Sequence, residues 1–353
     1  MSTDRDEILE MLRDSMQRYA ADNYNFASRK KVLKSSAGYS EDAWKTYAEL
    51  GWLAMRLPAE QGGIDADART LGVAMEVVGS HLLMEPLLAS TILATGILQR
   101  AATPAQQQAW LPALASGKIK MAVALDGKCE WRGGKLSGLA QCVLHADGAD
   151  RVIVAAQNVF CLVDPVGAGV ARKNFRLVDG RGAANLEFKE VVAEPLGLTN
   201  DESAIQCARD EATVALCAEA LGAMRRLIEI TNAYIKMRVQ FGKPIGNNQV
   251  LQHRMVDMYL LQEETRAVTA AAQDALDNIA PDRARTVSGA MAYVSRAARK
   301  VASEAIQMHG GIGITEELEV SHYYRRVMVI NSLFGNRDQH FVRFLSNSGA
   351  PWA

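Results

Sequence analysis

Aromatic residues are scarce in this chain, and no single sign of charge dominates it. Phe, Trp and Tyr make up 6% of its 353 residues, whereas 49% of the residues are hydrophobic, with many Ala, Leu, Val and Met residues. This composition favours packed helices over sheets. The 39 Lys and Arg residues are balanced by 40 Asp and Glu residues. A chain without a strong net field is a poor candidate for binding nucleic acid or an anionic membrane.

The cysteines give no sign of a disulfide framework or a metal site. There are five of them, scattered along the chain, and no two form a Cys-x-x-Cys pair. An odd number of unpaired positions indicates buried thiols in a reducing compartment. No apolar run reaches the roughly 18 residues that a membrane span needs, and the N-terminus begins with charged residues instead of a signal peptide. The sequence therefore predicts a cytoplasmic protein with no membrane span and no bound metal.

The common nucleotide-binding motifs are missing as well. The chain contains neither Gly-x-Gly-x-x-Gly nor a P-loop, and its strand candidates are not separated by helices of about ten residues, as a Rossmann fold requires. Any nucleotide must therefore bind by another route.

The local sequence pattern changes twice along the chain. Residues 1–118 show helical periodicity, and residues 119–198 consist of short β-prone runs between frequent glycines. Helices then return and lengthen over residues 199–353, with apolar stripes at 216–237 and 287–308 that are typical of a helical bundle. The predicted fold is mainly α with a small β domain, divided at these boundaries into three domains.

Two segments close long apolar helices with a glycine turn. The first is Arg238-Val-Gln-Phe-Gly-Lys-Pro-Ile-Gly246. Arg238 stays protonated, and its planar guanidinium matches the oxygens of a phosphate. Phe241 offers a flat face on which an adenine can pack, and Gln249, in the helix that follows, adds an amide donor and acceptor.

The second segment is Gln307-Met-His-Gly-Gly-Ile-Gly-Ile-Thr315. Gly310 and Gly311 allow consecutive backbone N–H groups to turn toward an anion, and Gln307 lies at the opening of this turn. Either glycine turn alone is compatible with a simple helix cap. The co-occurrence of Arg238 with Gln249 and Gln307 favours a bound phosphate.

The two segments resemble the paired signatures of the acyl-CoA dehydrogenase family of flavoproteins. Weaker matches at Trp44–Gly63, Ala102–Gly117 and Leu186–Gly197 extend the resemblance along nearly the whole chain. It implies an N-terminal helical domain, a β-barrel-like middle domain and a C-terminal four-helix bundle, with FAD as the cofactor.

In that family both loops grip the ADP end of an FAD held by a neighbouring subunit. By resemblance, the residues that serve one end of the flavin nucleotide are Arg238, Phe241 and Gln249. Those that serve the other end are Gln307, Gly310 and Gly311.

The family's catalytic glutamate has no counterpart in this sequence. A carboxylate is needed to remove the α-proton of the acyl-CoA thioester while a hydride passes to the flavin. At the two positions where family members carry it, this chain has Phe334 and Ala212. Glu211 is adjacent to the second position, but one residue along a helix turns a side chain by about 100°. The catalytic residue is therefore unknown. Asp210 matches a family aspartate near CoA and is the predicted substrate-binding residue, although Thr213 replaces the arginine that accompanies it.

The half-site that holds the flavin ring is also depleted. Where the family has Thr-Glu-Pro followed by Gly-Ser-Asp, this chain passes from Leu125 directly to Asp126. The nearest counterpart of the family's Trp-Ile-Thr is Cys142-Val-Leu-His145, and the threonine that touches the flavin is replaced by Asn336.

The chain thus keeps the residues that serve the ADP end of FAD but lacks the base and most of the residues that hold the flavin ring. In this it resembles the non-catalytic small subunit of a heteromeric acyl-CoA dehydrogenase, as in some bacterial complexes of steroid and dicarboxylate breakdown. Two alternatives remain open: a self-sufficient homo-oligomeric enzyme that uses Glu211 as its base, and a non-enzymatic scaffold that keeps the fold. The expected partners are an acyl-CoA substrate, a catalytic subunit in a heterotetramer or a second copy of the chain, and an electron-transfer flavoprotein. The expected pathway is fatty acid or steroid side-chain β-oxidation.

Overall fold

The structure is a computed structural model that describes residues 2–35, 37–157, 159–197 and 202–347. The chain divides into two compact units, each of which is described by itself. The first is drawn from Met1–Arg29, Ala68–Leu83 and Thr213–Ala353, and the second from Lys30–Asp67 and Met84–Ala212. The predicted boundary at 198/199 lies outside the described residues.

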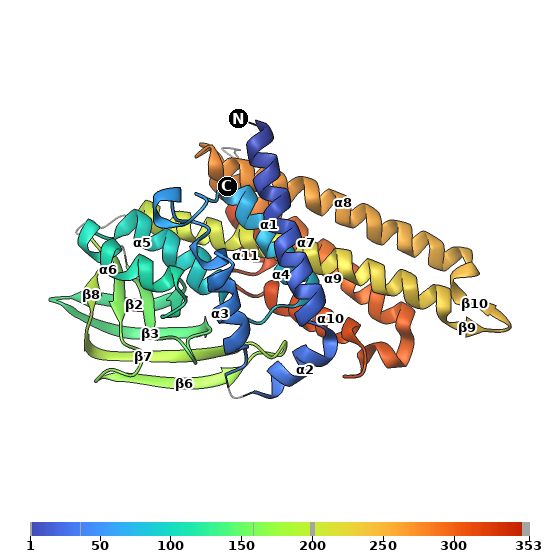
Figure 1. Cartoon of the computed structure of the whole chain (residues 1–353), viewed down its shortest axis with the longest axis horizontal. Coiled ribbons are helices and arrows are strands. Elements are labelled where there is room, and N and C mark those ends of the chain that lie inside the picture. The colour runs from blue at the N-terminus through green and yellow to red at the C-terminus, as the bar shows by residue number, and fades with distance from the viewer. Residues whose placement is uncertain (1, 36, 158, 198–201, 348–353) are drawn as a thin grey trace. The chain divides into compact units, whose positions relative to one another are not determined.

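The first unit is helical. Its elements are α1 (Ser2–Asn23), α4 (Ala68–His81), α7 (Glu202–Met237), α8 (Gln249–Asp277), α9 (Arg283–His309), α10 (Glu319–Ile330) and α11 (Arg337–Ser346). The helix α7 begins in the second unit and has 36 residues, which gives a length of about 54 Å at 1.5 Å per residue. The helices α8 and α9 lie side by side and are joined by a short connection (Figure 1).

Apolar spacing explains how these helices pack. The predicted stripe of α9 is buried throughout, at Val287, Ala290, Met291, Val294, Ala298, Val301, Ala305 and Met308. In α7 the prediction of burial holds for the middle of the helix, where Leu216, Leu221 and Leu227 are inaccessible or nearly so. The end of α7 is different, because Met237 is 74% exposed. The last turn of α7 therefore leaves the core.

The second unit contains two four-stranded sheets. Their strands are β1 (Met121–Ala124), β2 (Gly127–Arg132), β3 (Lys135–Leu144), β4 (Arg151–Ala156), β5 (Val159–Val163), β6 (Val170–Arg176), β7 (Gly182–Val192) and β8 (Glu194–Pro195). The strand orders are β1-β4-β5-β8 and β2-β3-β7-β6, with β1 and β4 parallel and the other neighbours antiparallel. Both sheets contribute to one apolar core, with Val154 and Leu186 among its members. This is the form that the predicted β-barrel-like domain takes.

Short helices complete the second unit. They are α3 (Glu41–Glu49), η1 (Trp52–Ala54), η2 (Ala59–Gln61), η3 (Leu87–Ala94), α5 (Thr95–Ala101) and α6 (Pro104–Ala115), while α2 (Phe26–Lys34) bridges the division between the units in sequence. The sequence marks the start of α6 well, because Thr103 and Gln106 form a capping box and Pro104 occupies the first turn. The apolar run Leu87–Ala94, which forms η3, is a π-helix of eight residues and not an α-helix.

Among the described residues, none of the helices combines the length and apolar character that crossing a membrane requires. The same residues contain no cluster of His, Cys, Asp and Glu side chains suited to hold a metal ion.

Candidate functional site

A strained hairpin follows the end of α7. The strands β9 (Val239–Gln240) and β10 (Lys243–Pro244) pair with a two-residue turn between them, at Phe241 and Gly242. Both turn residues have positive φ angles, 50° and 77°, as in a type I′ turn. A left-handed backbone costs a bulky residue such as Phe on the order of 1 kcal/mol or more. The Phe241 side chain is nevertheless fully exposed, so packing within the chain does not explain its presence.

Arg238 is anchored through its backbone and leaves its side chain free. Its N–H donates to the Tyr234 carbonyl oxygen at 2.8 Å, and its own carbonyl oxygen accepts from the Ile245 N–H at 2.9 Å. The guanidinium is exposed and has no ion-pair or hydrogen-bond partner among the described residues. Gln249 is the first residue of α8 and is also exposed. Both side chains are available to an external ligand.

The second predicted turn forms η5 (Gly310–Ile314), directly after α9. Gly310 has a φ of 65°, which only glycine adopts readily. A Cβ atom added at Gly310 or Gly311 would meet no atom within 4 Å, so open space surrounds both. Gly313 is different, because a Cβ there would lie 2.9 Å from the Ile306 carbonyl oxygen. Close packing therefore explains why position 313 is a glycine, whereas it does not explain the glycine at position 311. Gln307 is exposed on the last turn of α9.

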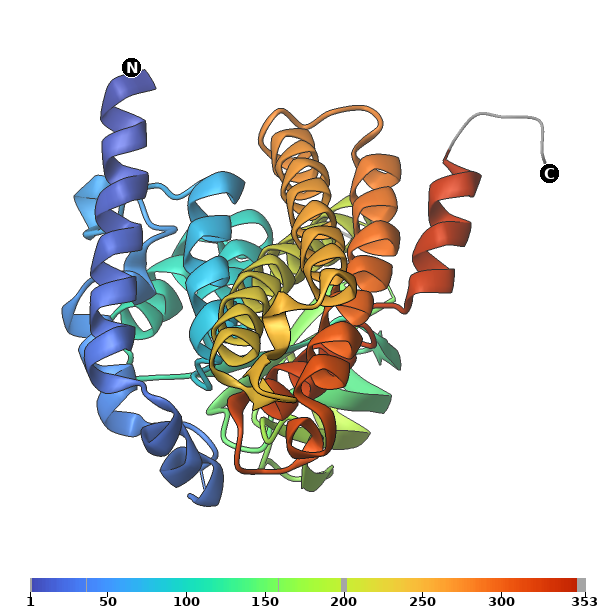
Figure 2. The ribbon, with the colours of Figure 1, turned by 90° about the vertical axis from the view of Figure 1, so that its right-hand side faces the viewer.

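The fold brings the ends of α7 and α9, which precede the two turns, together. The Tyr234 hydroxyl donates to the His309 carbonyl oxygen at 3.3 Å, and the two rings stack with centroids 4.3 Å apart. Because Tyr234 lies one turn before Arg238 and His309 immediately precedes Gly310, the ends of α7 and α9 are neighbours. This end of the first unit, with β9 and β10, faces the viewer in Figure 2.

The two family positions for a base carry no carboxylate. Phe334 is half-buried and has a φ of 55°, which is again an unfavourable backbone for a bulky side chain. Ala212 is fully buried in α7. The third candidate position, Glu211, does hold a carboxylate.

Glu211 is engaged by two arginines. Its carboxylate oxygens accept from Arg100 at 2.6 and 2.8 Å and from Arg56 at 3.2 Å. Burial alone would raise the pKa of this carboxyl, but the charges of Arg56 and Arg100 outweigh it and hold the pKa below its usual range. A carboxylate with a lowered pKa and a bidentate arginine partner is a weak proton acceptor. The arrangement suits a structural ion cluster better than a general base.

The β1–β2 connection, where the family loop is missing, is closed by a side chain from α7. Residues 125 and 126 link the strands, and Arg209 contacts both, donating to the Leu125 carbonyl oxygen at 2.6 Å and to the Asp126 carboxylate. The neighbouring residue, Asp210, has no exposed surface. Its assignment as a substrate contact gains no support from this burial and remains a prediction.

Sequence reasoning missed the ion-pair partners of these residues. Arg56 and Arg100 lie more than 100 positions from Glu211 and carry no motif. No local signal identifies them, because an arginine in a turn, such as Arg56, or on a short helix, such as Arg100, is normally solvated.

Models of known protein families match most of the chain. Residues 6–118 match the acyl-CoA dehydrogenase N-terminal domain, and residues 204–341 match the acyl-CoA dehydrogenase C-terminal domain.

Individual relatives agree with these matches. The acyl-CoA dehydrogenase IpdE2 of Mycobacterium tuberculosis is 31% identical over 325 residues, which cover 91% of each chain. A solved steroid acyl-CoA dehydrogenase variant, Tcur3481-Tcur3483, superposes with a TM-score of 0.90 at 25% identity over 97% of each chain. The ChsE4-ChsE5 complex of Mycobacterium tuberculosis gives 0.91 at 21% identity over 98% of each chain.

A cofactor is present in another solved structure of the same fold. A glutaryl-CoA dehydrogenase of Mycobacterium smegmatis in complex with FADH2 has a TM-score of 0.87 at 21% identity, over 99% of this chain and 97% of that one.

Proposed function

Because the chain belongs to the acyl-CoA dehydrogenase family of CH–CH oxidoreductases, we propose that it is the non-catalytic subunit of a heteromeric, FAD-dependent member. Its role is to bind the ADP end of an FAD whose flavin ring lies in a catalytic partner subunit. The observation that carries this proposal is the end of the first unit, where the ends of α7 and α9 are neighbours and Arg238, Phe241 and Gly310 are all exposed.

These residues suit the nucleotide end of FAD. The free Arg238 guanidinium matches a diphosphate, and the exposed Phe241 ring offers a packing surface for adenine. Open space at Gly310 and Gly311 admits a phosphate close to the backbone. Bound FAD supplies the acceptor for the hydride that leaves the acyl thioester.

The residues around the ring position suit FAD less well. Arg209 closes the connection where the family loop would hold the flavin, and neither Phe334 nor Ala212 can accept a proton. The α-proton must then be removed by a carboxylate from another chain.

An exposed apolar surface supports a partner subunit. Met237 at the end of α7 and Val239 of β9 are exposed, and exposed apolar side chains of α8 include Val250, Val256, Tyr259 and Leu260. Large apolar side chains that are exposed on neighbouring segments often mark protein interfaces. One structural neighbour is named as a complex of two proteins, ChsE4 and ChsE5.

The substrate class follows from the same resemblance. We propose an acyl-CoA from fatty acid or steroid side-chain breakdown as the substrate of the heterotetramer, and an electron-transfer flavoprotein as the electron acceptor. A cytoplasmic location remains an expectation.

The homo-oligomeric alternative depends on Glu211, and the ion cluster around that residue speaks against it. A non-enzymatic scaffold remains the second alternative, but it leaves the strained and exposed Phe241 without a role.

The proposal is tested by assaying the purified chain with FAD, an acyl-CoA and an artificial electron acceptor. We expect no turnover from the chain alone, since the loss of a general base typically costs roughly 10²- to 10⁴-fold in rate. Addition of the catalytic partner should produce turnover. Turnover by the chain alone that Glu211→Gln abolishes would establish the homo-oligomeric alternative instead.

A further inference from the structure

Tyr234 contacts both of the helix ends that precede the two turns. Its carbonyl oxygen accepts from the Arg238 N–H at 2.8 Å, and its hydroxyl donates to the His309 carbonyl oxygen at 3.3 Å. Its ring stacks on the His309 imidazole, with 27° between the two planes. Because Gly310 follows His309 directly, this one residue links the backbone of Arg238 to the start of the glycine turn.

The imidazole of His309 is fixed by α9 as well as by Tyr234. The ring is buried, and its Nδ1 lies 2.8 Å from the Ala305 carbonyl oxygen. Burial lowers the pKa of His309, so the ring is neutral at pH 7, and Nδ1 carries the proton because a carbonyl oxygen only accepts. A ring that is hydrogen-bonded on one side and stacked on the other has little freedom to turn. The contact between Tyr234 and His309 is therefore a rigid one.

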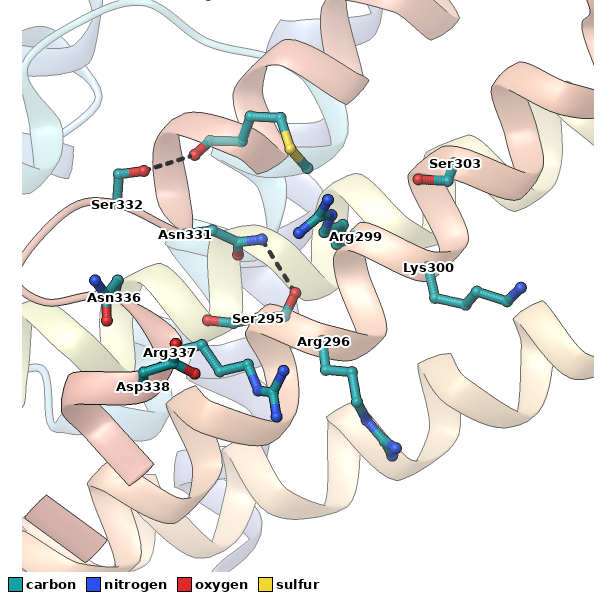
Figure 3. Close-up of a pocket in the computed structure, with 11 residues that line it drawn as sticks. Ser295, Arg296, Arg299, Lys300, Ser303, Asn331, Ser332, Asn336, Arg337 and Asp338 are labelled. Carbon is teal, nitrogen blue, oxygen red and sulfur yellow. Dashed lines mark hydrogen bonds between the residues drawn. The ribbon is translucent and has the colours of Figure 1, made fainter. Parts of the chain in front are cut away.

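The loop after Gly310 is fixed further along by other contacts. The helix α10 packs on α9, and directly after α10 the Asn331 side chain donates from Nδ2 to the Ser295 carbonyl oxygen at 3.0 Å (Figure 3). At the start of α10, Glu319 forms an ion pair with Arg226 of α7 at 2.9 Å. Both contacts join the bodies of the helices, and neither involves the last turn of α7. At the helix ends themselves, Tyr234 and His309 supply the contact.

A diphosphate that is bound from two sides requires a fixed separation between them. Charge-assisted hydrogen bonds span about 2.7–2.9 Å, and groups that act together must be held to within about 0.5 Å. Open space surrounds the Cβ positions of Gly310 and Gly311, so the turn gains little support from its own packing. Support must therefore come from the residue that precedes it.

We infer that Tyr234 and His309 are positioning residues, whose stacked rings and hydrogen bond hold the Gly310 turn at the separation from Arg238 that one diphosphate requires. Neither side chain contacts the diphosphate on this inference. It rests on the proposed function and adds to it the residues that act through the two turns.

The FAD affinity of the assembled complex, measured by flavin fluorescence, tests this role. Tyr234→Ala removes the stacked ring and the hydrogen bond and should weaken FAD binding by roughly tenfold. Tyr234→Phe keeps the stack and loses one long hydrogen bond, so it should weaken binding by no more than about threefold. Asn232→Ala, at an exposed position of the same helix, should leave the affinity unchanged.

A double substitution separates positioning from a general loss of stability. If Tyr234 acts by placing the Gly310 turn relative to Arg238, Tyr234→Ala should cost no more than about threefold once Arg238→Ala is present, because the two-sided grip is already lost. A merely structural role would instead give the full tenfold loss in both backgrounds. Arg18→Ala, at an exposed position of α1, is the control for Arg238→Ala. Thermal melting of each complex checks its folding, and His309→Ala takes the place of Tyr234→Ala if the latter prevents assembly.

The outcomes distinguish this inference from the proposed function. Weaker FAD binding in Arg238→Ala together with unchanged binding in Tyr234→Ala would overturn the positioning role alone, and so would losses that are fully additive in the double variant. Unchanged binding in Arg238→Ala would overturn the proposed function and the positioning role with it.

Discussion

The carboxylate of Glu211 lies between the guanidinium groups of Arg56 and Arg100, and its side chain is only 14% exposed. Removal of one member of such a cluster leaves the remaining charges poorly solvated. The same residue is the one candidate base that the sequence leaves open. Measuring stability and turnover together therefore distinguishes a structural role of Glu211 from a catalytic one.

We predict that Glu211→Gln lowers the free energy of unfolding by about 2 kcal/mol, less than for a fully buried pair because Arg100 is partly exposed. Urea denaturation measures this change. Glu60→Gln, at an exposed position without a described partner, should alter stability by no more than about 0.5 kcal/mol. In the assembled complex, turnover per folded complex should be unchanged by Glu211→Gln. An unchanged stability combined with lost turnover would contradict this account of the residue.

The spacing of residues carried the signal for the predicted site residues, and their roles remain predictions. Arg238, Phe241 and Gln249 follow one helix end, and the structure places all three side chains at the surface. Their contacts could not be predicted, because pairs such as Tyr234 with His309 are set by tertiary packing. The positive φ of Phe241 also has no sequence signal, since Phe is not a typical residue for such a turn.

At the scale of elements, α4 and α7 approach each other closely through paired glycines. A Cβ atom at Gly79 would lie 1.9 Å from the Glu219 carbonyl oxygen, and one at Gly222 would lie 1.9 Å from the Glu76 carbonyl oxygen. Each helix therefore uses a glycine to admit the backbone of the other. Near this crossing, Glu219 forms a buried bidentate ion pair with Arg326 of α10, at 2.7 and 2.6 Å.

Gly222→Ala should therefore destabilise the fold although alanine is the better helix former. Overpacking against a rigid carbonyl outweighs the propensity gain of about 1 kcal/mol, so we expect a net loss of about 2 kcal/mol or more. Gly311→Ala is a control for stability, because a Cβ there meets nothing within 4 Å. Equal denaturation midpoints for Gly222→Ala and the unaltered chain would show that the helices do not cross this closely.

Element types were more predictable than their details. The apolar stripe of α9 and the capped start of α6 follow directly from residue spacing and from Thr103 with Pro104. The π-helix from Leu87 to Ala94 was not predictable, because a run that is apolar on all sides has no periodicity to distinguish helix types.

At the scale of the whole molecule, the mainly α composition and the placement of a small β region could be predicted from the sequence. The compact units could not, because α4 lies early in the chain but belongs with α7, α8 and α9. That association depends on contacts between distant segments, such as Arg69 with Asp274 at 2.7 Å. The division into three domains, with its two boundaries, remains a prediction.

The central claim is that this chain binds the ADP end of an FAD whose ring lies in a partner. Its most direct test is the affinity of the assembled complex for FAD when the chain carries Arg238→Ala, measured by flavin fluorescence during titration. Loss of a charge-assisted diphosphate contact should raise the dissociation constant by roughly tenfold to a hundredfold, while Arg18→Ala leaves it unchanged. An Arg238→Ala complex that binds FAD as tightly as the unaltered complex would contradict the account.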